Sequence, residues 1–432
     1  IAESNVKNVN YYDQYDWVNN SSLNFQLYIN PRYTNVTGLA TGSMVRRLDT
    51  GTWMKTVFYY DDQNRLIQTQ AQNRYGVINQ TDRVLDFEGH LLGERTIYRR
   101  PSNADLTVST SYVYDHEGRR TSSTHTINGT NTPLVSYEYD EVGRLVRKSP
   151  GSTAPLQTND YSYTIRGQLR GINLNTSGNI NLSGNDLFAL KLDHHETGVT
   201  FNGKLNKQTW QSRTTPAASS APRSFTYAYD GFDRVSAATF TGVGSEDYGM
   251  PGIDYDANGN LTAFNRKGMA SPGNYESIDI LAFNYTNIIG NKLQYIREWG
   301  NNSVGFTEID FFNTNDYTYY PDGSLKSDAN KGITLIEYNY LGFVDKVHFG
   351  SSKRIENVYD SEGIKLEQRL INGSTTHNIE YMGDLIYKNG VLEIILHDEG
   401  RVKVEGTNRR YQFFITDHLG STRAIVERVS GI

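Results

Sequence analysis

The chain has 432 residues with a formal net charge of -6, and it contains 31 Tyr, 39 Gly and no Cys. Its acidic and basic residues are interspersed, which argues against a nucleic-acid groove or an anionic membrane surface as partner. Without cysteine there is no disulfide framework, thiolate metal site or cysteine nucleophile. Tyrosine and threonine favour half-buried strands whereas Gly, Asn and Asp favour tight turns, so the composition predicts a β-rich chain with many hairpins.

The first 58 residues include the aromatic stretch "YYDQYDWV" at Tyr11. We expect an N-terminal β segment over residues 1–58 that leads into the rest of the chain. No signal-peptide pattern opens the sequence and residue 1 is Ile, so a processed product or a piece of a longer protein is expected. The longest apolar runs, such as "VLEIIL" at 391–396, are far shorter than a membrane span, and no membrane insertion is predicted.

A short motif recurs along the chain. Its clearer copies are "YVYDHEGRR" at Tyr112, "YEYDEVGRL" at Tyr137, "YSYTIRGQL" at Tyr161, "YAYDGFDRV" at Tyr227, "IDYDANGNL" at Ile253 and "YTYYPDGSL" at Tyr317. Weaker copies are "YYDDQNRL" at Tyr59, "FNYTNIIGNKL" at Phe283, "YNYLGFV" at Tyr338 and "VYDSEGIKL" at Val358. About ten copies in one chain indicate a repeat array and not ten active sites.

One copy, "YEYDEVGRLVR" at 137–147, shows the structure that the repeat predicts. Tyr137 and Tyr139 are two residues apart and therefore project to one face of a strand. Asp140 suits an Asx turn, and Gly143 can supply a positive φ before the return strand. Each repeat is thus expected to be a strand, a "DxxG" turn and a second strand. Stacked hairpins should bury a continuous face and bring the tyrosines of successive strands into cross-strand contact.

The repeat motif is absent between residues 171 and 222, where "NTSGNINLSGND" and "TTPAASSAP" indicate long turns or exposed loops. Helical periodicity is scarce, and the only helical turn expected is around Leu187 to Leu192. No linker divides the chain into independent domains.

Two polar clusters are candidate sites. The "DHHE" of Asp193 to Glu196, together with His397 and Asp398, resembles a metal-ligand set, but adjacent residues of a strand point to opposite faces, so a polar loop is favoured. The "DHLG" of Asp417 to Gly420 holds an Asp-His pair and is better explained as a turn. No nucleophile elbow or glycine-rich phosphate loop occurs. We therefore expect no catalytic, cofactor-binding or metal-binding residues and no cofactor.

The "YxYDxxGRL" copies are similar to the YD repeats of RHS (rearrangement hotspot) proteins. The resemblance extends to "FNGKLNKQTW" at 201–210, "YMGDLIYKNGVLEIILHDEGRV" at 381–402 and "FITDHLGSTRAIV" at 414–426, and "LDTGTWMKTVFYYDDQNRLIQTQAQN" at 48–73 resembles RHS chains common in Bacteroidota. It implies an all-β fold in which repeat hairpins form a long spiralling antiparallel sheet, part of a hollow shell. The implied organisation is a repeat shell over 59–413 and the start of the RHS-associated core over 414–432.

In that family the shell encloses a C-terminal toxin, and many members cleave themselves with acidic residues downstream of "DHLGSTR". No residue here matches those acids. The expected function is therefore a non-catalytic shell piece of an exported protein, secreted or attached to the cell surface, that carries its own C-terminal toxin or effector. Its other partner would be a secretion machinery, for which the type IX system suits Bacteroidota-like chains. The alternative is a surface adhesin that binds glycans through exposed tyrosines, and a glycosidase is a third, weaker reading.

Overall fold

The structure is a computed structural model that describes residues 6–18, 23, 25–28, 31–151, 155, 157–194, 203–215, 217–218, 220–285 and 290–428. Within these residues it consists of antiparallel β-strands joined by turns and loops, with no α-helix. Among the same residues, no helix is long and apolar enough to cross a membrane. The predicted all-β fold is confirmed.

Hydrogen bonding orders the strands sequentially in four sheets. The first sheet contains β1 (Asn8–Asp13), β2 (Val36–Arg46), β3 (Trp53–Tyr60), β4 (Leu66–Gln72), β5 (Ile78–Leu85), β6 (Leu91–Tyr98), β7 (Leu106–Tyr114), β8 (Arg120–Ile127), β9 (Thr130–Tyr139), β10 (Leu145–Pro150), β11 (Asn159–Tyr163), β12 (Leu169–Ile172), β13 (Phe188–Asp193), β14 (Lys207–Ser212), β15 (Arg223–Tyr229) and β16 (Val235–Thr241). The second sheet contains β17 (Gly252–Tyr255), β18 (Leu261–Ser271), β19 (Asn274–Tyr285) and β20 (Leu293–Glu298).

The third sheet is the pair β21 (Tyr317–Tyr319) and β22 (Leu325–Asp328). The fourth contains β23 (Leu335–Tyr338), β24 (Val344–His348), β25 (Lys353–Tyr359), β26 (Lys365–Asn372), β27 (Thr375–Met382), β28 (Leu385–Lys388), β29 (Val391–His397), β30 (Gly400–Glu405), β31 (Asn408–Thr416) and β32 (Thr422–Arg428). The one long sheet of the prediction is therefore divided, and the interruptions fall between β16 and β17, between β20 and β21, and between β22 and β23.

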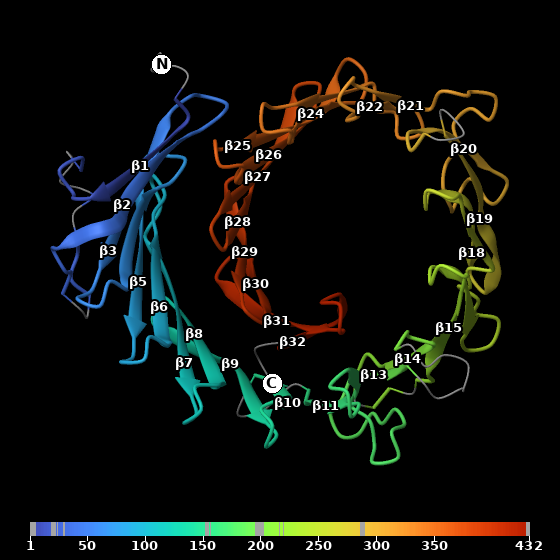
Figure 1. Cartoon of the computed structure of the whole chain (residues 1–432), viewed down its shortest axis with the longest axis horizontal. Helices are drawn as coiled ribbons and strands as arrows, with labels where there is room; N and C mark the ends of the chain where they lie inside the picture. Colours follow the sequence, from blue (N-terminus) through green and yellow to red (C-terminus); the bar gives the residue numbers. More distant parts are fainter. Residues whose placement is uncertain are drawn as a thin grey trace.

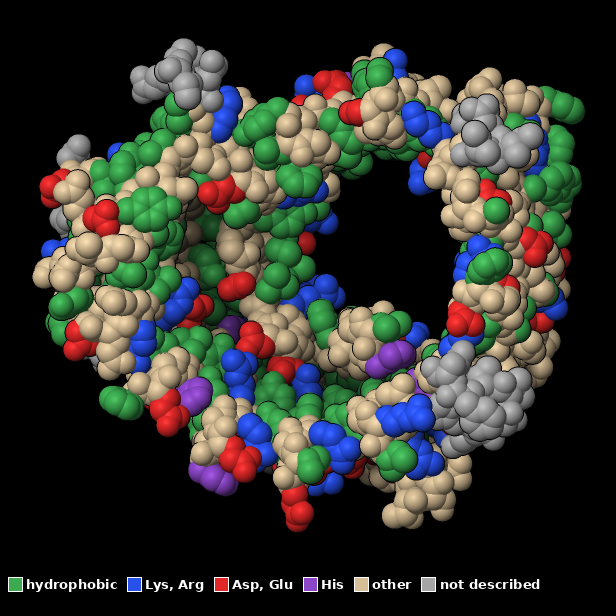
Figure 2. Space-filling model, in the orientation of Figure 1, with side chains coloured by type: hydrophobic (Ala, Val, Ile, Leu, Met, Phe, Trp, Pro, Cys, Tyr) green, Lys and Arg blue, Asp and Glu red, His purple; other side chains and the backbone are tan. Residues whose placement is uncertain are grey.

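The sheets follow one another around a spiral (Figure 1). The first sheet forms the left and lower wall, the second and third sheets form the right and upper wall, and β25–β32 return along the inner side of the first sheet. The space-filling view shows an opening through the middle of the molecule (Figure 2). We call the contact between the outer strands β2–β13 and the inner strands β25–β32 the seam.

Apolar packing within the seam provides the main core. One cluster joins Tyr98, Val108, Ile127, Leu134 and Val135 of the outer strands to inner residues that include Met382, Leu385, Tyr387, Ile395, Val402, Tyr411 and Phe413. A second cluster joins outer Ile172, Phe188, Leu190 and Leu192 to inner Ile415 and Val426. A third lies near the N-terminus and packs Leu23 on Val57 and Tyr59 of β3. Successive turns of the spiral are thus held together as two packed layers.

The helical turn expected around Leu187 to Leu192 is wrong. All of these residues except Leu187 belong to β13, in which Phe188, Leu190 and Leu192 are buried. They are two residues apart, so they share the strand face that packs on the inner layer. The period of the apolar residues is that of a strand, and a run of six residues is too short to show a helical period reliably.

Candidate functional site

In most repeats the turn is built around an aspartate, whereas Thr164 and Asn339 hold this position in two copies. In the copy at 137–147, Oδ1 of Asp140 accepts the amide N–H groups of Val142 and Arg144 at 3.1 and 2.8 Å. Gly143 has a φ of 82° and donates its N–H to the Asp140 carbonyl at 2.9 Å, as the predicted turn requires. Burial raises the pKa of Asp140, but the hydrogen bonds from Arg144 and Val142 and the charge of Arg144 together hold that pKa below its usual value.

The basic residue after the glycine links one repeat to the next. Nε of Arg144 donates to Oδ2 of Asp140 at 2.7 Å, and the guanidinium lies 5.2 Å from the ring centre of Tyr163 in the following repeat. The hydroxyl of Tyr163 donates to the carbonyl of Leu145 at 2.7 Å. We call this arrangement of turn cation, next tyrosine ring and accepting carbonyl the tyrosine latch.

The tyrosine latch recurs around the spiral. Tyrosine hydroxyls donate to the carbonyl just after the turn in the pairs Tyr114–Leu91, Tyr139–Arg120, Tyr229–Leu205, Tyr255–Val235, Tyr285–Leu261, Tyr319–Leu293 and Tyr338–Leu325. A cation covers the ring in several of them, as Arg119 does for Tyr139 and Arg234 for Tyr255. The tyrosine–tyrosine contact predicted for these positions occurs at Tyr338, whose ring packs edge-on against Tyr320 at 6.0 Å. At Tyr139 and Tyr255 the ring instead lies beneath an arginine.

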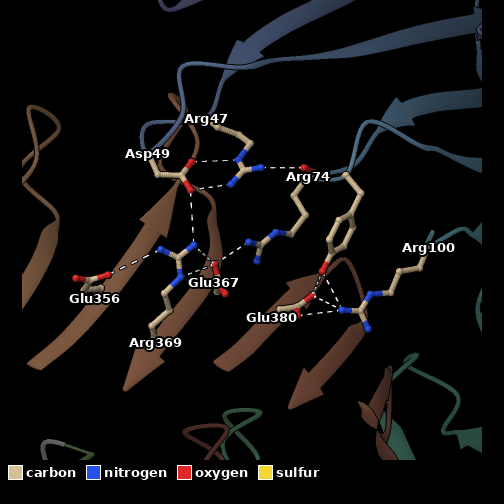
Figure 3. Close-up of polar contacts among 9 residues, drawn as sticks. Arg47, Asp49, Arg74, Arg100, Glu356, Glu367, Arg369 and Glu380 are labelled. Atoms are coloured by element: carbon tan, nitrogen blue, oxygen red, sulfur yellow. Dashed lines mark hydrogen bonds and ion pairs between the residues drawn. The ribbon is translucent and has the colours of Figure 1, made fainter. Parts of the chain in front are cut away.

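Polar side chains close the upper part of the seam (Figure 3). Glu367 of the inner β26 accepts Arg74 from the outer layer at 2.7 Å and its own neighbour Arg369 at 2.6 Å. Arg369 also approaches Asp49 of the outer layer at 3.8 Å, and Asp49 pairs with Arg47 at 2.7 Å. Burial raises the pKa of Glu367, but the two guanidinium groups lower it by more, so the carboxylate stays charged.

A second polar contact in Figure 3 joins β27 to the outer layer. Glu380 is 5% exposed, and it accepts Arg100 at 3.1 Å and the hydroxyl of Tyr75. Arg100 donates further to the carbonyl of Gly390 at 2.6 Å and lies over the ring of Tyr387. Because both charges are largely buried and hydrogen-bonded, loss of either partner would leave an uncompensated charge between the layers.

The lower part of the seam repeats this chemistry with tyrosines of the repeats. Tyr137, the first tyrosine of its copy, donates its hydroxyl to Glu399 of the inner layer, which also pairs with Lys148. Arg120 pairs with Asp398 at 2.9 Å. Sequence reasoning missed all of these contacts, since nothing in the repeat pattern indicates which residue hundreds of positions away will face a given tyrosine.

Two of the candidate clusters from the sequence lie near each other: burial, together with repulsion from His194 of the "DHHE" stretch, lowers the pKa of His418 in the "DHLG" stretch. Asp417 accepts the amides of Leu419 and Ser421 at 2.9 and 3.0 Å and pairs with Arg423 at 2.6 Å, so the predicted turn into β32 is confirmed. Asp193 ends β13 and pairs with Lys191. His195 and Glu196 of the "DHHE" stretch lie outside the described residues. His397 and Asp398 are in the seam.

Three possible metal ligands come together elsewhere among the described residues. Ligand atoms of Asp86, Glu88 and His90 lie within 4.8 Å of one another. All three belong to a hairpin turn, in which Asp86 accepts the amide and Nδ1 of His90 at 2.8 Å. His90 stands where other repeats have arginine and stacks on Tyr114, so the tyrosine latch accounts for this group without an ion.

The comparisons with known proteins agree with this geometry. The model of the teneurin YD-shell family matches residues 54–431. Crystal structures of TcdB2-TccC3-TEV and TcdB2-TccC3-Cdc42 both align with a TM-score of 0.53 over 92% of this chain, at 13% and 14% sequence identity. The chain spans only 23% of the length of each, and at this identity the likeness concerns the fold. No curated protein sequence matches the chain.

The family match covers most of the chain and includes the repeats, the seam and the last turn. The YD-shell architecture of this family accounts both for the repeated turns and for the spiral of hairpins that they build. The chain belongs to the teneurin YD-shell family.

Proposed function

We propose that this chain is a wall segment of a shell that encloses a C-terminal toxin or effector segment of its own parent protein. The observation that carries the proposal is the seam: the spiral returns on itself and packs its last strands against its first with a buried apolar cluster. Such packing gives the wall a closed circumference around the opening in Figure 2. The resemblance to RHS proteins supplies the identity of the enclosed segment.

The inner layer offers a surface for such a segment. Along β27–β31, cross-strand neighbours Tyr381, Ile386, Ile394, Lys403 and Arg410 form one row. They alternate with the residues that pack on the outer strands, so this row faces the opening. Its apolar part suits an incompletely folded chain, and its other part is a charged edge in which Glu405 pairs with Lys403 at 2.7 Å and with Arg410 at 3.1 Å.

The shell that we propose is non-catalytic and exported, either released or held at the cell surface. Its wall is built from turns, latches and seam contacts whose aspartates and arginines already serve structural roles. Its partners would be the enclosed segment and a secretion machinery.

Protease protection tests the proposal. The full reading frame, with any segment encoded after Ile432, would be expressed and treated with proteinase K. Protection of the downstream segment in the intact protein, and its digestion in the seam variant Glu380→Ala, are expected. The matched control Glu393→Ala changes an exposed carboxylate that pairs only loosely with Lys388. A downstream segment that is digested as fast in the intact protein as in the seam variant would refute enclosure.

A further inference from the structure

Two histidines meet across the lower part of the seam. His125 of the outer β8 is 1% exposed, and its ring centre lies 5.7 Å from that of His397, at the end of the inner β29. Tyr411 of β31 contacts both rings at 5.8 Å. His397 also packs on Phe413 of the main apolar cluster. The two rings therefore form part of the apolar contact between the layers.

The hydrogen bonds around the two rings suit the neutral form. Nδ1 of His397 accepts the amide N–H of Glu399 at 3.2 Å, which leaves its proton on Nε2, and Nε2 is buried without a partner. Nδ1 of His125 lies 3.1 Å from the hydroxyl of Tyr411. A second proton on His397 would point at the Glu399 amide, so protonation removes this contact and leaves a charge between the layers.

We propose that His125 and His397 make the seam an acid-sensitive closure, which separates the inner and outer layers when both rings become protonated. This inference rests on the seam and does not depend on any enclosed segment. The signal is protonation of the two imidazole rings, and the response is separation of the inner strands from the outer strands of the spiral.

The surroundings of the two rings disfavour their protonated forms while the seam is closed. Burial lowers the pKa of His125 to about 4, with Asp398 opposing and Arg409 adding to the effect. Burial, with repulsion from His125, lowers the pKa of His397 to about 3, against the opposing effect of a backbone hydrogen bond at Arg401. The other titratable or charged groups around the pair are Tyr112, Arg120, Tyr137, Lys148, Asp384 and Glu399.

The lowered pKa values determine the sign of the pH effect. A histidine exposed by opening regains a pKa near 6.5, so below that pH the open form binds more protons than the closed form. Stability of the seam is therefore fully present above about pH 6.5 and falls as the pH drops toward the closed-state values. Each histidine can favour opening by up to about tenfold per pH unit in this range.

Spin labels can measure the opening, because the chain has no cysteine of its own. Nitroxides would be attached in the double variant Asn131→Cys, Asn408→Cys, which changes two exposed residues on β9 and β31. Pulsed electron resonance distances would be recorded at pH 8, 6.5, 5.5 and 5, and again after return to pH 8. We expect a single short distance at pH 8 and a reversible longer component that grows below pH 6.5.

The variant His125→Phe, His397→Phe in the same background should stay closed at pH 5. If it does not fold, His125→Gln, His397→Gln keeps a polar, non-titrating side chain at both positions and should also stay closed. His116→Phe is the control, since the side chain of His116 is 88% exposed, and it should open like the parent. If the Phe or Gln variants open at the same pH as the parent, carboxylates and not the two histidines cause the opening, and the proposal is overturned. A parent that stays closed at pH 5 would also overturn it.

Discussion

At the scale of single residues, one side chain, in most repeats an aspartate, organises the hairpin tip. Asp140 accepts two amides with one oxygen and a guanidinium with the other. The turn was predictable because Asx turns and positive-φ glycines have local sequence requirements. The chain itself shows which parts are replaceable: Asn339 accepts the amides of Leu341 and Phe343 in the same way.

Replacement of Gly143 by Val should weaken the fold. A φ of 82° is strained for a β-branched residue and costs about 1 to 3 kcal/mol. Urea denaturation followed by fluorescence would measure the change in the free energy of unfolding. Gly143→Asn is the matched control, because asparagine tolerates this conformation, and it should lose much less stability. Equal losses in the two variants would contradict the turn assignment.

Replacement of Asp140 by Asn should leave the hairpin in place, as Asn339 does in its own repeat. It removes the charge partner of Arg144, so a small loss of stability is expected, whereas Asp140→Leu, which cannot accept the two amides, should lose clearly more. Amide hydrogen exchange of Val142 and Arg144 reports on the turn directly. Rapid exchange of both amides in the Asn variant would show that the carboxylate itself is needed.

At the scale of elements, the tyrosine latch joins each hairpin to its neighbour. The sequence shows the spacing of tyrosine, aspartate and arginine, but not that the arginine contacts the ring of the next repeat and not its own. The register shift beside the turn, as at Val113 and Tyr114, also leaves no clear sequence signal. Both features depend on how two hairpins stack, which is a tertiary property.

Removal of one latch hydroxyl should have a modest, local cost. Tyr139→Phe keeps the ring under Arg119 and removes only the bond to the carbonyl of Arg120, so a loss of about 1 kcal/mol is expected. Tyr139→Leu removes the ring as well and should cost more. Thermal unfolding of the two variants beside the parent measures both effects. A Phe variant as unstable as the Leu variant would place the main contribution in the hydroxyl.

At the scale of the whole molecule, the seam determines the shape. The hollow shell followed from the family resemblance, and the repeats predicted the hairpins, but no local pattern pairs Arg100 with Glu380 or His125 with His397. Those partners lie 280 and 272 positions apart and meet only after the spiral has turned once. The division into four sheets was also not predictable, because the lengths of the loops do not indicate where strand pairing stops.

Breaking the Glu380 contact should loosen the seam. Glu380→Ala leaves Arg100 without its carboxylate, and removal of one partner from a buried pair costs about 3 to 5 kcal/mol. The double variant Arg100→Met, Glu380→Leu should recover much of the loss, because no charge then remains buried. Hydrogen exchange of β27 and β6 would locate the effect at the seam. A double variant less stable than Glu380→Ala would contradict the stated cause.

Enclosure is tested most directly by an electron cryo-microscopy map of the protein expressed from its full reading frame. A shell predicts additional density inside the opening, next to the inner face of β27–β31, belonging to chain beyond the wall. A map in which the wall surrounds an empty opening while all remaining chain lies outside would contradict it.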